Sequence, residues 1–242
     1  MKRVLRLAVL LLIGVLALQL YFAGRIAMMA LIAPQSTTFQ RSEAWRLAVE
    51  QHAIAWSQDW VDDTSTALKR AVIASEDAGF VDHGGVDWDA LEKAWERNQK
   101  AELRMGKRLQ FKPTARPLAP KVVGGSTITQ QLAKNLFLSG ERNLIRKGQE
   151  FVITLALEAC LSKQRILAIY LNNVEWGEGV FGAQAAARHY FRVDARQLSA
   201  AQAARLAVML PAPKRFEKRP GSAYVLSRAA TIEARMGAVA LP

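Results

Sequence analysis

The chain has 242 residues, enough for one medium-sized domain and a short accessory segment. Hydrophobic residues make up 51% and charged residues 22%, which excludes wholesale disorder and allows a packed core. The formal charge of +12 favours an anionic partner, such as nucleic acid, phospholipid headgroups or a phosphorylated substrate, without choosing among them.

The N-terminal residues 1–33 predict a membrane anchor. An apolar run from Leu7 to Gly24 is interrupted by Gln19 alone, and about 18–20 apolar residues are enough to cross a bilayer as a helix. Three basic residues precede the run: Lys2, Arg3 and Arg6. The positive-inside rule therefore places the N-terminus in the cytoplasm and the rest outside. A cleaved signal peptide is the alternative, but its apolar region is normally shorter, so we expect an uncleaved anchor.

Residues 34–60 have mixed polarity and predict a connector, in which Trp45, Trp56 and Trp60 either rest at the membrane interface or pack on the domain. From there to the end, residues 61–242, apolar side chains recur with helical spacing, and we find no two-residue alternation and no hairpin signal. The expected domain is mainly α. The lone cysteine, Cys160, excludes an intramolecular disulfide, and its apolar neighbours indicate a small buried residue.

The segment 98–123 is strongly basic and contains Pro113, Pro117 and Pro120, which break any long helix. We expect a partly mobile excursion. It is either a solvated loop or a lid beside the site, because long loops in compact domains are often functional.

Four polar clusters follow one another along the predicted domain. They are Glu76-Asp77-Ala78-Gly79-Phe80-Val81-Asp82-His83-Gly84-Gly85, then Gly124-Gly125-Ser126-Thr127-Ile128-Thr129-Gln130-Gln131-Leu132-Ala133-Lys134-Asn135, then Arg146-Lys147-Gly148-Gln149-Glu150, and finally Lys163-Gln164-Arg165-Ile166-Leu167-Ala168-Ile169-Tyr170-Leu171-Asn172.

In these clusters the chain resembles the family 51 glycosyltransferases, which comprise the polymerase domain of class A penicillin-binding proteins and the monofunctional biosynthetic peptidoglycan transglycosylases. The family patterns E-D-x-x-F-x-x-H-x-G, G-G-S-T-I-T-Q-Q-x-x-K-N, R-K-x-x-E and K-x-x-I-L-x-x-Y-L-N are all met in this order. The resemblance covers residues 60–235, and the chain looks like the monofunctional form. It implies a mainly α, lysozyme-like fold with two lobes.

The first cluster supplies the expected catalytic base. Glu76 matches the family's catalytic glutamate and follows an apolar helical stretch, so we expect it at a helix end, where partial burial raises the pKa of a carboxylate. The alternative is a surface acid paired with Lys69 or Arg70. His83 does not complete a usual zinc pattern with Glu76 and Asp77, so we expect it to orient the loop, with Phe80 packed beneath. From the match to the family motif we also expect Asp77, Phe80 and His83 to bind substrate.

The second cluster predicts a helix that is capped by Ser126 or Thr127 and carries a polar face toward substrate. The alternative is a capped amphipathic helix with a solvated polar face. The residues of this face at four-residue spacing are Gln130, Gln131, Lys134 and Asn135.

In the third cluster, Arg146 and Glu150 are spaced for an ordinary helical ion pair. The functional interpretation is that Arg146 and Lys147 bind the pyrophosphate of a polyprenyl-linked sugar and stabilise the leaving group. Glu150 matches the family's second glutamate and would orient these cations or the donor sugar. In the fourth cluster we expect Asn172 to bind substrate, and Tyr170 to be structural.

The resemblance implies polymerisation of lipid II with the growing chain as donor, inversion to a β-1,4 linkage, and release of polyprenyl pyrophosphate. The implied partners are lipid II, the lipid-linked strand, the membrane and cell-wall or division proteins, with no nucleic acid. The implied location is a bacterial inner membrane with a periplasmic catalytic domain. The sequence requires no cofactor and predicts no metal ligands. A Mg²⁺ ion could bridge the pyrophosphate and an acid such as Asp77, but no spacing demands it. Two alternatives are a lytic enzyme of similar fold and a non-catalytic membrane scaffold.

Overall fold

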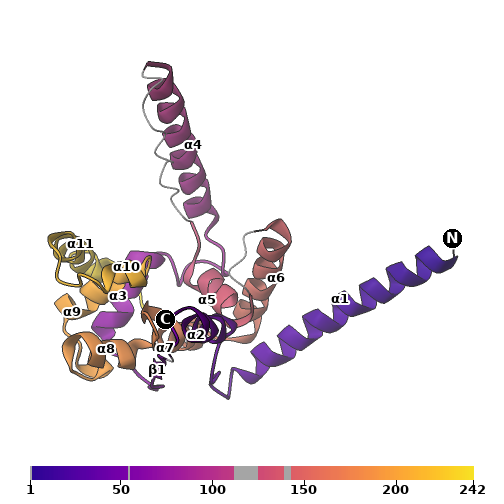
Figure 1. The fold of residues 1–242 in the computed structure, drawn as a ribbon, viewed down its shortest axis with the longest axis horizontal. Helices are drawn as coiled ribbons and strands as arrows, with labels where there is room; N and C mark the ends of the chain where they lie inside the picture. The colour runs from indigo at the N-terminus through magenta and orange to yellow at the C-terminus, as the bar shows by residue number, and fades with distance from the viewer. Residues whose placement is uncertain (1, 54, 112–124, 139–142) are drawn as a thin grey trace.

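The fold is that of a computed structural model, which describes residues 2–53, 55–111, 125–138 and 143–242. The described part is mainly α, as predicted (Figure 1). Its α-helices are α1 (Lys2–Met28), α2 (Thr38–Glu50), α3 (Thr66–Glu76), α4 (Trp88–Phe111), α5 (Ile128–Phe137), α6 (Leu144–Cys160), α7 (Lys163–Asn173), α8 (Ala183–Phe191), α9 (Ala200–Met209), α10 (Pro213–Phe216) and α11 (Ala223–Glu233). Short 3₁₀ turns are η1 (Ala195–Gln197) and η2 (Met236–Ala238).

Helix α1 is long and apolar enough to cross a membrane and is, among the described residues, the helix that meets this criterion. It extends away from the body, and its C-terminal end reaches α6 (Figure 1). Ile26 and Met29, at that end, are buried in the core of the domain. The apolar helix is therefore continuous with the packed domain at its C-terminal end.

The predicted connector, 34–60, contains helix α2. Thr37 caps this helix in a capping box with Gln40, and Gln40 also donates to the backbone oxygen of Asn173 at 3.2 Å. Trp45 is 73% exposed, whereas Trp56 packs against Phe181. Helix α2 is largely polar and has low amphipathicity, so the pattern of apolar residues did not predict it.

Two groups of helices form the core. Helix α9 packs against α3 and α11, while α5 packs against α6 and α7. Helix α7 lies against α5, α6 and α8, and seven of its eleven residues are buried. On α3 the apolar residues Leu68, Ala71 and Val72 lie on one helical face, and all three are fully buried.

A small three-stranded sheet is present, although we predicted none. Strands β1 (Ser57–Gln58), β2 (Glu175–Gly177) and β3 (Val180–Phe181) are ordered β1-β3-β2, with β1 parallel and β2 antiparallel to β3. Strands of two or three residues are too short for an alternating pattern to be recognised. Gly179 joins β2 to β3 with a positive φ of 72°, and a Cβ there would lie 2.5 Å from the backbone oxygen of Ala55.

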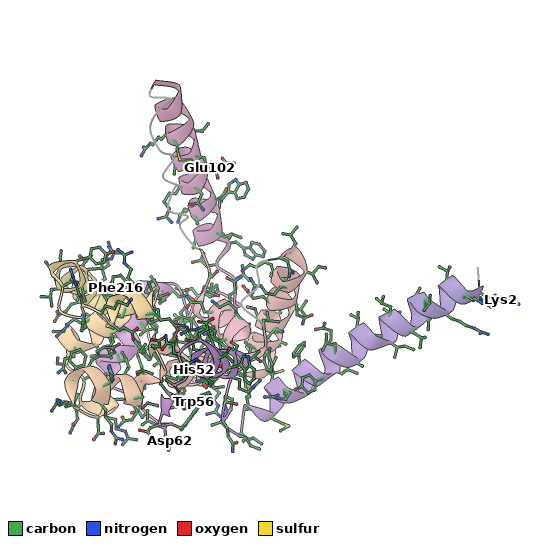
Figure 2. All side chains as sticks on the ribbon, viewed as in Figure 1. Lys2, His52, Trp56, Asp62, Glu102 and Phe216 are labelled. Atoms are coloured by element: carbon green, nitrogen blue, oxygen red, sulfur yellow. The ribbon has the colours of Figure 1, made fainter. Side chains whose placement is uncertain are left out.

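The basic segment 98–123 is not an irregular excursion in its first half, because α4 continues to Phe111. Its three prolines all follow this residue and lie, with 112–124, outside the described residues. Helix α4 stands clear of the body (Figure 1), and Figure 2 shows Glu102 on this projecting part. Our expectation for Cys160 is also wrong, because this residue at the end of α6 is exposed.

Candidate active site

Helices α2, α5 and α6 enclose a groove of about 290 Å³. Its lining is mostly polar, with two apolar residues from α2 and the end of α5. The lining residues are Phe39, Ser126, Gln130, Gln131, Lys134, Asn135, Leu138, Arg146, Lys147 and Glu150. The structure therefore brings the predicted residues of the second and third clusters to one surface, except Thr127, which is buried and does not line the groove.

The beginning of α5 is held by residues of the first cluster. Thr127 is the N-cap residue, forms a capping box with Gln130 and donates from Oγ1 to the backbone oxygen of Gly85 at 2.6 Å. Asp77 accepts a hydrogen bond from the backbone nitrogen of Ile128 at 3.0 Å. The prediction that Ser126 or Thr127 caps this helix is confirmed for Thr127, and Ser126 lies exposed at the groove.

Glu76 is the last residue of α3, as expected for a residue at a helix end. Its Oε2 accepts a hydrogen bond from Nε2 of Gln131 at 3.0 Å, and Gln131 lines the groove. Glu76 is thus connected to the groove through Gln131. The alternative of a surface pair is wrong, because Lys69 pairs with Asp63 at 2.5 Å and Arg70 donates to the backbone oxygen of Met236.

Burial raises the pKa of the Glu76 carboxyl group above its usual value, and the neighbouring charge of Asp77 adds to this effect. Hydrogen bonds from Gln131 and from the Ser75 hydroxyl, at 3.3 Å, act in the opposite direction. A carboxylate with a raised pKa accepts a proton more readily than an exposed one.

Gln131 has a second partner on α7. The hydroxyl group of Tyr170 donates to Oε1 of Gln131 at 2.9 Å, and Tyr170 is fully buried. The sequence indicated only a structural role for Tyr170, because the spacing of motifs along a chain does not reveal contacts between helices.

Helix α6 presents the two cations of the third cluster around one acid. Arg146 donates to Oε2 of Glu150 at 2.9 Å, and Lys147 forms an ion pair with the other oxygen. Glu150 is only 3% exposed, whereas the side chain of Lys147 is 50% exposed. The expected Arg146–Glu150 pair is present, and the buried acid holds both cations at the groove.

Asp77, Phe80 and His83 do not line the groove, although we expected them to bind substrate. His83 accepts from the backbone nitrogen of Gly85 through Nδ1, so its Nε2 carries the proton shared with Asp77 at 2.9 Å. Phe80 is fully buried, with its ring edge-on to His83 and the Lys163 ammonium 4.5 Å above its face. Asp77 directly, and His83 through Gly85, therefore support the start of α5.

Asn172 is also placed away from the groove. Its Oδ1 accepts from the backbone nitrogen of Val61 at 2.9 Å, and its Nδ2 donates to the backbone oxygens of Val61 and Ala168. The Asn172 side chain is buried, and both of its polar atoms form hydrogen bonds within the protein. Asn172 therefore joins α7 to the segment before α3 and does not offer a contact to substrate.

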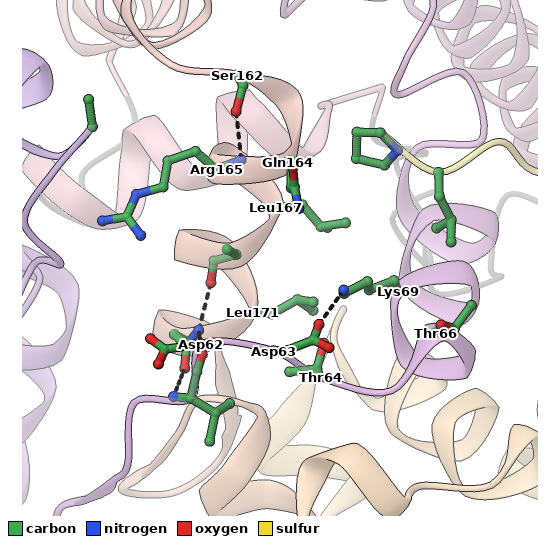
Figure 3. Close-up of a pocket in the computed structure, with 16 residues that line it drawn as sticks. Asp62, Asp63, Thr64, Thr66, Lys69, Ser162, Gln164, Arg165, Leu167 and Leu171 are labelled. Carbon is green, nitrogen blue, oxygen red and sulfur yellow. Dashed lines mark hydrogen bonds and ion pairs between the residues drawn. The ribbon is translucent and has the colours of Figure 1, made fainter.

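A second hollow, of about 420 Å³, lies between α7, the start of α3 and the end of the chain (Figure 3). It is lined by Asp62, Asp63 and Lys69, among others, and Figure 3 shows the Lys69–Asp63 ion pair across it. Glu76 and the third cluster do not line it. The groove between α5 and α6 is therefore the candidate active site.

Among the described residues, no group of three or more His, Cys, Asp or Glu side chains is arranged to hold a metal ion. Asp77, the acid that we considered for a bridging Mg²⁺ ion, has one oxygen paired with His83 and the other with the backbone of α5. This carboxylate does not fit a bridging role.

A family model described as Transglycosylase matches residues 40–237. A biosynthetic peptidoglycan transglycosylase from Burkholderia pseudomallei is 53% identical over 94% of this chain and 83% of its own length. Proteins with the same name from Paraburkholderia phytofirmans and Cupriavidus metallidurans are each 51% identical, covering 94% and 96% of this chain and 88% and 95% of their own lengths. The four motifs, the groove that the second and third of them line, and this similarity along nearly the whole chain place the protein in the transglycosylase family.

Proposed function

We propose that the protein polymerises peptidoglycan glycan strands from lipid II and releases polyprenyl pyrophosphate. The observation that carries this proposal is one groove that presents Arg146 and Lys147 and reaches Glu76 through Gln131. Family membership and the names of the relatives support the same activity.

In this mechanism Glu76 is the general base. As a sugar hydroxyl of lipid II attacks the anomeric carbon of the donor, Glu76 takes the hydroxyl proton. The new bond joins the acceptor oxygen to that carbon, and the bond from the carbon to the pyrophosphate oxygen breaks. Attack from the face opposite an α-linked pyrophosphate inverts the centre and gives a β-1,4 linkage.

The leaving group departs as a pyrophosphate, so the site needs cations rather than a second proton donor. Arg146 and Lys147 face the groove together with Lys134, and all three would stabilise the charge that grows on the pyrophosphate. Glu150 fixes the first two cations through its ion pairs. The amides of Gln130 and Asn135, with the Ser126 hydroxyl, are suited to hydrogen bonds with sugar.

The groove favours polymerisation over cleavage of the same polymer. A glycosidase uses one carboxylic acid to protonate the departing sugar oxygen and a second carboxylate as base or nucleophile. Among the groove-lining residues the acid is Glu150, and both of its oxygens are engaged by cations. Two cations held at the groove suit a departing pyrophosphate, which carries negative charge, whereas a departing sugar oxygen needs a proton.

We also propose a single-pass location in a bacterial inner membrane, with the catalytic domain in the periplasm. The apolar helix α1 supports anchoring, and Lys2, Arg3 and Arg6 before its apolar run support a cytoplasmic N-terminus. The partners would be lipid II, the growing strand, the surrounding membrane and cell-wall or division proteins, with no nucleic acid.

Purified full-length protein in detergent with labelled lipid II tests the activity. The proposal predicts long glycan polymer that a muramidase digests. Shortening of preformed glycan would instead support a lytic enzyme, and binding of lipid II without turnover would support a scaffold. Parallel reactions with Mg²⁺ and with a chelator test the ion requirement that the sequence left open.

A further inference from the structure

Three side chains from three helices form a continuous line of hydrogen bonds that ends at Glu76. Tyr170 on α7 donates to Oε1 of Gln131 on α5 at 2.9 Å, and Nε2 of Gln131 donates to Oε2 of Glu76 on α3 at 3.0 Å. We propose that Tyr170 is a positioning residue, which keeps the Gln131 amide turned so that it donates to the ionised form of Glu76.

The two ends of the Gln131 amide group form different hydrogen bonds. A side-chain amide offers an acceptor oxygen and a donor NH₂ group, and a half-turn exchanges them. An ionised carboxylate only accepts hydrogen bonds, whereas a protonated one also donates. With its NH₂ toward Glu76, Gln131 stabilises the ionised carboxylate. With its oxygen there instead, it would favour the protonated acid, which cannot act as a base.

Tyr170 selects between these two orientations. Its hydroxyl donates to the amide oxygen, so Nε2 is left to face Glu76. Burial raises the pKa of the Tyr170 hydroxyl well above its usual value, and the carboxylates of Glu76 and Asp77 raise it further. The hydroxyl group therefore keeps its proton, and it stays a donor over the whole working range of pH.

Few other groups of the described chain act on Glu76. Asp77, the next residue, raises its pKa, and the Ser75 hydroxyl lowers it through a 3.3 Å contact. His83 and Lys163 exert their charges on Asp77. The Gln131 hydrogen bond is the strongest of the effects that oppose burial, so the direction in which this amide points shifts the balance between ionised and protonated Glu76.

The inference rests on the proposed function, because it assumes that Glu76 is the base. The test measures kcat/KM for lipid II polymerisation against pH for the wild type and for Tyr170→Phe, with full-length protein. Loss of one hydrogen bond moves a pKa by about half a unit to one unit. The apparent pKa on the acidic side of the kcat/KM profile, called the acidic limb, is therefore expected to be higher by that amount in Tyr170→Phe. At alkaline pH, where Glu76 is ionised in both proteins, the rates should approach each other.

Tyr190→Phe is the matched control. The Tyr190 hydroxyl also makes a single hydrogen bond inside the fold, to the backbone oxygen of Trp176 at 2.9 Å, but it has no contact with Gln131 or Glu76. Its removal should lower the melting temperature as Tyr170→Phe does and leave the acidic limb in place. A merely structural role for Tyr170 would make the two variants alike in both measurements.

A second variant, Gln131→Met, removes the donor itself and should shift the acidic limb in the same direction by at least as much. An unmoved limb in either folded variant overturns the proposal, and so does failure of both to fold, since the hydrogen bonds would then serve stability alone. The Glu76→Gln variant distinguishes failure of the positioning role from failure of the proposed function. If Glu76→Gln keeps full activity, the base assignment fails; if it is inactive while Tyr170→Phe has a wild-type profile, only the positioning role fails.

Discussion

The side-chain amides of Gln19 and Gln149 exchange two hydrogen bonds, of 2.8 and 3.0 Å. Gln19 interrupts the apolar run of the anchor helix, and Gln149 immediately precedes Glu150 on the helix that carries the cations of the groove. The anchor is therefore joined by a polar contact to the same helix that we expect to meet the pyrophosphate.

This contact predicts measurable coupling between the two residues. In a double-mutant cycle, Gln19→Leu and Gln149→Leu should each lower stability, and the double variant should lose less than their sum, by about 0.6–1.7 kcal/mol. Thermal unfolding in one detergent measures it. Gln19→Leu combined with Gln164→Leu is the control, because Gln164 is an exposed residue of α7. Strict additivity at positions 19 and 149 would mean that the amide pair does not hold the anchor to α6.

Charge reversal at Lys147 should reduce the reaction with the lipid-linked donor far more than it reduces the stability of the fold. The Lys147 side chain is half exposed, and the buried Glu150 keeps its ion pair with Arg146, so Lys147→Glu should lower the melting temperature only moderately. A second acid beside Glu150 should reduce kcat/KM for lipid II by at least about tenfold. Lys218→Glu, at an exposed lysine outside the groove, controls for net charge. Equal kinetics for the two variants would remove Lys147 from the pyrophosphate site.

Asp77 should contribute chiefly to stability. Its two oxygens hold His83 and the first backbone nitrogen of α5, both inside the fold. Asp77→Ala leaves these donors without a partner and should cost about 1–3 kcal/mol of unfolding free energy, measured by denaturant titration. Asp82→Ala, at an exposed acid of the same loop, should cost less than about 0.5 kcal/mol. A stable Asp77→Ala protein with weakened substrate binding would instead support the sequence-based prediction that Asp77 binds substrate.

Glu175 predicts a pH-dependent stability. The residue is 7% exposed, and burial, with Glu43 and Glu217 nearby, raises its pKa to about 7, while Lys214 at 3.7 Å acts against this. A raised pKa means that the folded protein holds the proton more tightly than the unfolded chain. Stability from this group is therefore present at low pH and is lost as the pH rises from about 4.5 to about 7.

Glu175→Gln removes this titration. The stability of the variant relative to the wild type should increase as the pH rises. The melting temperature of the variant minus that of the wild type should therefore be larger at pH 8 than at pH 5, by about 5 °C or more. Measurements at both pH values by differential scanning calorimetry check this. The same difference at both pH values would contradict a raised pKa for Glu175.

The sequence was sufficient for the anchor, the helical class and the groove, because each depends on local patterns. Glu76 falls at a helix end, Thr127 is a cap, and Arg146 and Glu150 are one turn apart, all of which follow from spacing along one helix. The site predictions that the structure does not support concern residues whose contacts join distant segments of the chain. Asn172 is a polar residue in a motif, but its partner Val61 lies over a hundred residues away in the chain.

Other features were hidden for different reasons. Helix α2 has little apolar periodicity and is held by polar bonds to α5 and α7, such as that from Thr38 to the backbone oxygen of Leu136. Helix α4 runs further than the prolines suggested, because all three come after its last residue, Phe111. Helix α4 shows that helix boundaries are hard to predict from local signals alone.

The most direct test of the account is the rate of lipid II polymerisation by Glu76→Gln, measured beside the wild type and Asp82→Asn with equal amounts of folded protein. General base catalysis contributes about 10²–10⁴-fold, so we predict a loss of at least a hundredfold for Glu76→Gln and near wild-type activity for Asp82→Asn. Polymerisation by Glu76→Gln at the wild-type rate would contradict the assignment of Glu76 as the base.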